Sequence, residues 1–139
     1  MDGTLPQPGV DVLLGIGEWF KKNGEAIYGT RPWTVYGEGP TRNVAGASFS
    51  EEKDKPFTAQ DIRFTTKGNA LYAILLGWPE KDLLITSLPE GKPLWFGPIQ
   101  QVRVLGAGQL LRWTQDRQGL RVEVPQTHPG DHAYVLKMT

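Results

Sequence analysis

The residues best suited to chemistry lie in the segment 127–132, which brings together His128, Asp131 and His132. Two imidazoles beside a carboxylate suggest either a metal site or a base held by an orienting carboxylate. A zinc site needs about three or four ligands, and the sequence has no third histidine and no cysteine. The proline and glycine within the segment indicate a turn. We therefore expect ordinary loop histidines here, and neither a metal nor a cofactor.

Carboxylates are the second source of possible chemistry. Acid–base hydrolysis uses two carboxyl groups on opposite sides of the reacting bond, roughly 5 to 9.5 Å apart. Three candidates, Glu51, Glu52 and Asp54, lie beside lysines in one charged run. Asp116 lies in a predicted turn, and Glu123 points outward from a predicted strand. The sequence also has no GxSxG nucleophile elbow and no phosphate-binding glycine loop. We expect no catalytic residue in this chain.

Tryptophan is abundant, with five indoles at positions 19, 33, 78, 95 and 113. Sugar rings stack on flat aromatic faces, so exposed indoles would indicate a carbohydrate-binding surface. Trp78 and Trp95 are the candidates for that surface, because each lies within two residues of a proline in a turn. The other three fit packing positions in the cores and at a helix-to-sheet junction. The alternative is that all five pack inside the fold.

The composition is that of a globular chain of one domain's length, with 39% hydrophobic and 22% charged residues in 139. Fifteen basic residues balance fifteen acidic ones, which argues against a nucleic-acid partner. No apolar run approaches the roughly 20 residues of a membrane span. Seventeen glycines and eleven prolines favour a fold with many turns.

The first element is a predicted helix over residues 6–24. Prolines open it, Lys21 and Lys22 lie near the negative end of its dipole, and Asn23-Gly24 provides a left-handed stop. Its apolar residues form two flanks, Val10, Leu13, Leu14 and Phe20 on one and Val12, Ile16 and Trp19 on the other. Either a β domain wraps both flanks, or something that should cover the helix lies outside this chain.

From Asp61 onward the apolar period changes to two, which is typical of half-buried strands. The run 69–78 is apolar on both faces and predicts a central strand. Further strands are expected at 62–65, 83–87, 99–105, 110–114, 120–124 and 133–137, and the short links at 67–69, 78–81 and 116–119 imply antiparallel neighbours. The fold class is mainly β, an antiparallel β-sandwich of about seven to eight strands with one N-terminal α-helix.

Several segments, in register, resemble glycoside hydrolase family 29 α-L-fucosidases. They are GEWFKKNGEAIYGTRPW, GEGPT, DIRFTTKGNALYAILLGWP and the terminal AYVLKM. The opening DGTLPQP is similar to the loop after the last strand of the catalytic barrel in that family. The resemblance implies two parts, a final barrel helix and junction at 1–33 and a C-terminal β-sandwich domain at 34–139. Within the second part, residues 37–60 are rich in Gly, Pro, Ser and charge without a sustained period, which predicts a long surface loop.

The resemblance also implies that the catalytic Asp and Glu lie upstream of this chain, on the barrel. The parent would be a retaining enzyme that removes α-linked L-fucose without a cofactor, in a periplasmic, extracellular or lysosomal location. The barrel is the expected partner, with Leu13, Ile16, Phe20, Tyr28, Arg31 and Trp33 as interface candidates. Glycans are a second expected partner, and the uncovered helix predicts self-association.

Overall fold

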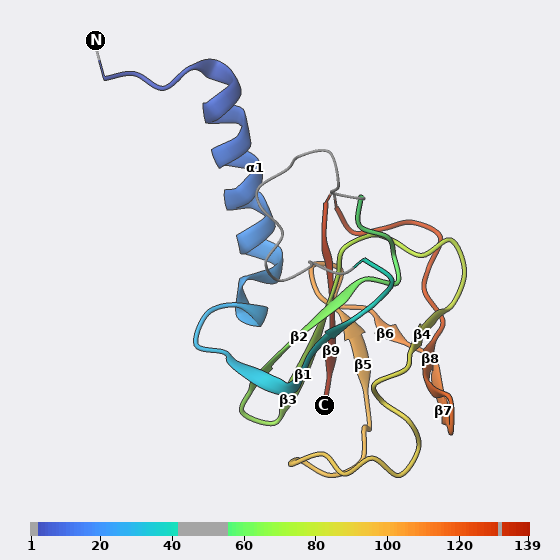
Figure 1. The fold of residues 1–139 in the computed structure, drawn as a ribbon. Coiled ribbons are helices and arrows are strands. Elements are labelled where there is room, and N and C mark those ends of the chain that lie inside the picture. The colour runs from blue at the N-terminus through green and yellow to red at the C-terminus, as the bar shows by residue number, and fades with distance from the viewer. Residues whose placement is uncertain (1–2, 42–55, 131) are drawn as a thin grey trace.

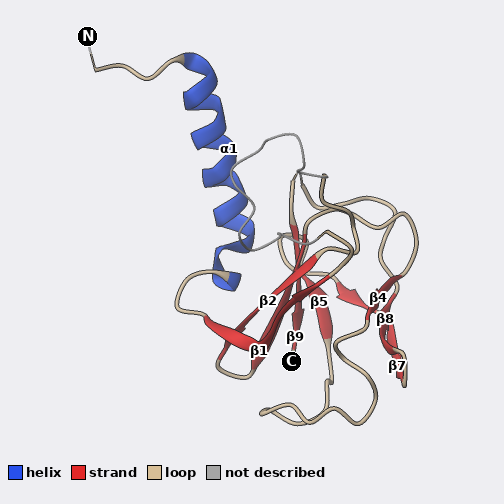
Figure 2. Cartoon of the chain, in the orientation of Figure 1, coloured by secondary structure: helices blue, strands red, loops and turns tan. Residues whose placement is uncertain are grey.

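A computed structural model describes residues 3–41, 56–130 and 132–139 as one α-helix, a 3₁₀ turn and nine strands (Figures 1 and 2). The strands form two antiparallel sheets, so the mainly β prediction is confirmed. The larger sheet has the order β1-β2-β3-β9-β5-β6, with β1 Arg31–Glu38, β2 Ile62–Lys67, β3 Ala70–Leu75, β5 Val102–Val104, β6 Leu110–Leu111 and β9 Tyr134–Met138. The smaller has the order β4-β8-β7, with β4 Leu83–Ile85, β7 Trp113–Asp116 and β8 Gly119–Val122.

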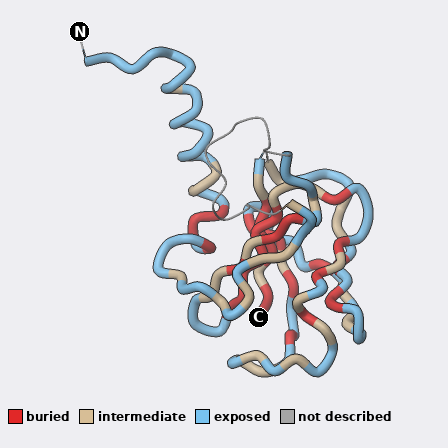
Figure 3. Tube along the Cα trace, viewed as in Figure 1, coloured by how far each residue is buried: buried red, intermediate tan, exposed pale blue. Residues whose placement is uncertain are grey.

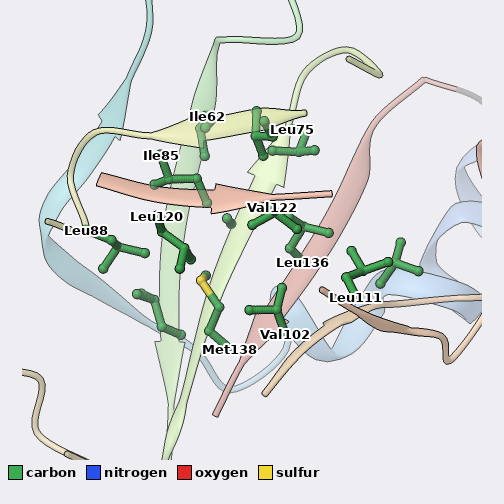
Figure 4. Packing of buried hydrophobic residues seen from close by; sticks show 14 of the residues in the cluster. Ile62, Leu75, Ile85, Leu88, Val102, Leu111, Leu120, Val122, Leu136 and Met138 are labelled. Atoms are coloured by element: carbon green, nitrogen blue, oxygen red, sulfur yellow. The ribbon is translucent and has the colours of Figure 1, made fainter. Parts of the chain in front are cut away.

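The main core lies between the two sheets (Figure 4). Strand β2 shows how the sequence pattern builds it, because Ile62 and Phe64 are buried there while Arg63 and Thr65 point to the other face. Side chains from the smaller sheet close this core from the opposite side, among them Leu83, Ile85, Leu120 and Val122. Burial of these apolar side chains is what holds the two layers together.

A second, smaller core covers the outer face of the larger sheet. It joins Tyr72 and Ile74 of β3 and Val135 of β9 to Ala26, with Trp19 packed against them. Strand β3 is therefore buried on both faces and lies between β2 and β9, as its apolar run predicts. The larger sheet is thus the middle layer of the domain.

The helix α1 (Gln7–Asn23) begins close to its predicted start but ends differently. Gly24 has φ −59°, so the left-handed stop predicted there is wrong. Instead the chain continues into the 3₁₀ turn η1 (Gly24–Ala26), and the left-handed residue is Gly29, with φ 66°. Among the described residues, no helix is both long and apolar enough to cross a bilayer.

Three expectations about the strands need correction. Strand β1 was not expected, because its proline and glycine conceal the alternation of Trp33 and Val35, and its last two residues fall in the loop expected at 37–60. The single strand predicted at 110–114 is two strands, β6 and β7, which belong to different sheets. The link at 78–81 does not join neighbours, because β3 pairs with β2 and β9 whereas β4 pairs with β8. The part of the proposed loop at 42–55 lies outside the described residues.

Candidate docking surface

Most of α1 stands away from the sheets, and only its last turns reach the β domain (Figures 1 and 3). The burial colours of Figure 3 show this change along the helix. The exposed fractions of its large apolar side chains are 62% for Val12, 56% for Leu13, 63% for Leu14 and 47% for Ile16. The β domain therefore does not wrap both flanks. Contiguous apolar surface of this kind on a folded chain marks an interaction site.

The amino-acid composition of α1 makes its exposure more unusual. Glycines at positions 9, 15 and 17 have open space where a side chain would lie, so nothing within the described chain requires them. Each is about 1 kcal/mol less favourable in a helix interior than alanine. The N-cap residue, Pro6, makes no side-chain capping hydrogen bond. Neither propensity nor capping accounts for a helix of this length, so its stability has to come from packing.

Three polar contacts fix the end of α1 and the following turn η1, two to the loop before β9 and one to β2. The indole N–H of Trp19 donates to the Ala133 carbonyl at 2.9 Å. The Lys22 ammonium donates to the Pro129 carbonyl at 3.2 Å. From β2, the Thr65 hydroxyl donates to the carbonyl of Ala26 at 2.6 Å. These bonds set the direction in which the helix leaves the domain.

The carboxylate of Glu25, in the turn η1 directly after the helix, adds to this attachment. The Tyr72 hydroxyl and the Lys137 ammonium both donate to Glu25 Oε2, each at 2.9 Å. The hydrogen bond from Lys137 lowers the pKa of Glu25, and burial together with the Glu25 contact raises the pKa of Tyr72. Glu25 and Lys137 are far apart in the sequence, which carries no local signal for the pair.

A shallow groove of about 600 Å³ follows one side of α1. Its apolar lining comes from Val12, Ile16, Trp19 and Phe20, and His132 joins it from the loop before β9. Among the described residues, His132 is the one non-glycine residue with a positive φ, 78°. Asp11 and His132 are the polar residues of its lining, and the mainly apolar remainder suits an apolar partner surface better than a small polar ligand.

The six predicted interface residues do not share one surface. Leu13 and Ile16 are exposed on α1, and Phe20 contacts the exposed Tyr28 ring with a centroid distance of 5.3 Å. Trp33 instead packs against Phe64 in the main core, with ring centroids 5.1 Å apart. By strand alternation Arg31 shares the face of Trp33 rather than that of the helix. Sequence reasoning passed over Val12 and Leu14 as candidates, although both flanks of the helix had been identified.

Trp78 and Trp95 lie at opposite ends of the larger sheet. Trp78 follows β3, is half-buried, donates to the Pro125 carbonyl at 3.0 Å and packs on Tyr134 at 4.9 Å. Trp95 is 48% exposed and donates to the carbonyl of Gly68 in the turn that precedes β3. The six residues of β3 between them correspond to roughly 20 Å. The two indoles therefore do not form one sugar-stacking platform.

The remaining candidates for chemistry do not converge. Asp116 accepts the backbone N–H groups of Gln118 and Gly119 in the β7–β8 turn, and these bonds lower its pKa. His128 contacts the Gly130 carbonyl, and Glu123 is exposed. The positions Glu51, Glu52, Asp54 and Asp131 lie outside the described residues. In the described part of the chain, no three His, Cys, Asp or Glu residues gather where they could hold a metal ion.

One buried carboxylate was missed by sequence reasoning. Asp61 is fully buried and accepts the backbone N–H groups of Thr41 at 2.9 Å and Thr58 at 2.7 Å, as well as the Thr58 hydroxyl at 3.1 Å. Burial alone would raise the pKa of Asp61, but these hydrogen bonds outweigh it and the pKa lies below its usual value. Gly39 (φ 129°) passes so close to Asp61 that a side chain there would collide with it. The Thr-x-x-Asp spacing is the signal that could have identified this turn.

These features define the class: an antiparallel β-sandwich domain that presents an exposed apolar helix. The family model for the α-L-fucosidase C-terminal domain matches residues 54–139. The chain therefore belongs to the family of α-L-fucosidase C-terminal domains, which are the non-catalytic part of these glycoside hydrolases.

The similarity to full-length relatives extends beyond the residues matched by the family model and includes α1. The tissue α-L-fucosidase of Rattus norvegicus is 31% identical over 99% of this chain and 26% of its own length. The plasma α-L-fucosidase of Pongo abelii is 33% identical over 91% of this chain and 23% of its own. The crystal structure of Thermotoga maritima α-fucosidase is 29% identical, with a TM-score of 0.67 over 99% of this chain and 28% of that one. The chain thus spans about a quarter of the length of these relatives.

Proposed function

We propose that this chain is the part of an α-L-fucosidase that supports the catalytic barrel without contributing a catalytic residue. The observation that carries the proposal is the uncovered apolar surface of α1. The chain that presents this surface spans only about a quarter of the length of its relatives. Burial of such a surface against a partner removes apolar area from water at about 25 cal/mol per Å². The catalytic part of the parent is the partner that fits, because α1 lies within the matched segment.

The parent protein is proposed to hydrolyse α-L-fucosides with retention, using an Asp and a Glu that lie outside this chain. Three of the described carboxylates support this division. Asp61 and Glu25 are occupied by structural hydrogen bonds, and Asp116 holds a turn. Each therefore already has a role in the fold.

The first test is turnover. The purified chain is expected to release no product from an aryl α-L-fucoside, whereas the complete parent, assayed at equal molar concentration, is expected to release it. Repurification through a second column and assay of each fraction separates the chain from contaminating host enzyme. Turnover that follows the chain through both columns would show that the proposed role is wrong.

The second test concerns α1. The chain alone is proposed to self-associate through this helix, because water contacts its apolar flanks. We expect sedimentation velocity to show a concentration-dependent oligomer that Ile16→Asp converts to a monomer. The same change in the complete parent should reduce the soluble, active fraction several-fold, since a charge would then be buried without a partner. Glu18→Gln, on an exposed polar position of the same helix, is the matched control. A strictly monomeric wild-type chain would contradict the self-association.

Carbohydrate binding is the weaker alternative. Trp95 presents an exposed ring, but its N–H is engaged with Gly68 and its neighbour Phe96 packs edge-on at 4.9 Å. Trp78, the other indole proposed for the surface, is a packing residue at the far end of the sheet. One exposed indole remains, so the support for the docking role is stronger.

A further inference from the structure

The outer face of the larger sheet is only partly covered by α1 and η1. Strand pairing places Arg63 opposite Ile74, and Ile74 opposite Val135, so these three residues form one row across β2, β3 and β9. Trp19 of α1 packs on the second core, which contains Ile74 and Val135. Arg63 therefore lies on the strand next to Ile74, at a strand spacing of about 5 Å, and Ile74 belongs to the core that α1 contacts.

Three side chains gather at this edge. The Arg63 guanidinium lies 5.9 Å from the ring centre of Tyr36 and 5.8 Å from that of Phe57. Tyr36 is 73% exposed and Phe57 is 48% exposed. We call Tyr36, Phe57 and Arg63 the edge cluster. Two aromatic rings around an arginine have the composition of a binding hot spot, in which aromatic area and a pre-positioned guanidinium act together.

Within the described part of the chain, the Arg63 guanidinium makes one hydrogen bond. One of its N–H groups donates to the Ile62 carbonyl at 3.1 Å. Arginine has five such donors, and no ion pair in the described part of the chain involves Arg63. The two rings hold the side chain in place, so little conformational entropy is lost when an acceptor arrives. A carboxylate matches the remaining donors in both charge and geometry.

We infer that the docking surface continues from α1 onto the β1–β2 edge, where the edge cluster receives an acidic group of the parent's catalytic part. The occupant follows from continuity, because Arg63 lies in one row with Ile74 and Val135, and these two residues belong to the outer core on which α1 packs. This inference rests on the proposed function, because it takes the catalytic part as the partner. It adds a polar, orienting contact to a helix surface that is otherwise apolar and therefore non-directional.

Hydroxyl-radical footprinting of the 139-residue chain and of the complete parent tests the inference. Tyr36 and Phe57 are expected to be oxidised readily in the chain and at least about fivefold more slowly in the parent, because a hot-spot core excludes water. Trp95, which is as exposed as Phe57 but lies at the opposite end of β3, is the internal control and should react equally in both. Peptides of α1 report on the proposed function in the same experiment.

The outcomes are distinguishable. Protection of α1 without protection of Tyr36 and Phe57 leaves the proposed function standing and overturns the inference. Protection of neither contradicts both. If Tyr36 and Phe57 already react slowly in the chain alone, the cluster is covered internally and the inference is also overturned.

Substitution of Arg63 separates an interface role from a structural one. In the parent, Arg63→Gln should restore oxidation of Tyr36 toward its rate in the isolated chain, and Arg63→Lys should not rescue protection, since an ammonium lacks the planar fork. In the 139-residue chain, Arg63→Gln should shift the unfolding temperature by less than about 2 °C. A larger shift there would show that Arg63 stabilises the domain itself and would contradict the inference.

Discussion

Leu136→Ala is expected to lower the free energy of unfolding by about 3 kcal/mol, whereas Leu13→Ala should change it by less than about 0.5 kcal/mol. The chemical change is identical at the two sites, but the surroundings differ. Leu136 lies in the main core with no exposed surface, so its truncation leaves a cavity between the sheets. Leu13 is 56% exposed and leaves none. Urea unfolding followed by tryptophan fluorescence measures both values.

The same pair locates the docking surface. In the complete parent, Leu13→Ala is expected to become destabilising by more than about 1 kcal/mol, because the methyl groups it removes would then be buried. Leu136→Ala should cost about the same in both proteins. An equally small effect of Leu13→Ala in chain and parent would mean that this flank of the helix stays in water, and the proposed interface would have to be moved elsewhere.

Asp61→Ala is expected to destabilise the chain by about 3 kcal/mol, because two backbone N–H groups would lose their acceptor, the buried carboxylate. Those groups belong to Thr41, shortly after β1, and to Thr58, shortly before β2, so Asp61 joins two separate stretches of the chain. Asp61→Asn keeps the shape and one acceptor oxygen and should cost roughly half as much. Asp116→Asn, which changes an exposed turn carboxylate, is the control and should have a smaller effect.

The contribution of Asp61 should also depend on pH. Its pKa is lower in the folded chain than in the unfolded chain, so the folded state favours the ionised form. The stabilisation is therefore complete above the unfolded pKa of about 3.9 and is lost as the pH falls through the folded pKa. The difference in unfolding free energy between wild type and Asp61→Asn should be constant from about pH 8 to 5 and shrink below about pH 4. A constant difference down to about pH 2 would show that the charge of Asp61 is not what the hydrogen bonds stabilise.

Local sequence patterns predicted the strands whose burial follows from the spacing of their own apolar residues. The alternation at Ile62 and Phe64 identified β2, and the two-sided apolar run identified β3 as central. Local patterns failed where a strand carries breakers or changes partner. Strand β1 contains Pro32 and Gly37, and its pairing with β2 shifts register between them. Residues 110–116 alternate well enough for one strand, and only sheet pairing divides them.

The sequence by itself determined that the chain is mainly β, that its first helix is apolar on two flanks, and that it resembles an α-L-fucosidase C-terminal region. These properties depend on residue type and spacing along the chain, which are local quantities. Only the tertiary structure decided that both flanks of the helix are exposed along most of its length, that Trp33 and Trp78 are packing residues, and that Glu25 meets Lys137. It also brought Tyr36, Phe57 and Arg63 to one edge. Contacts between residues distant in sequence depend on strand order and register, and no local pattern encodes either of them.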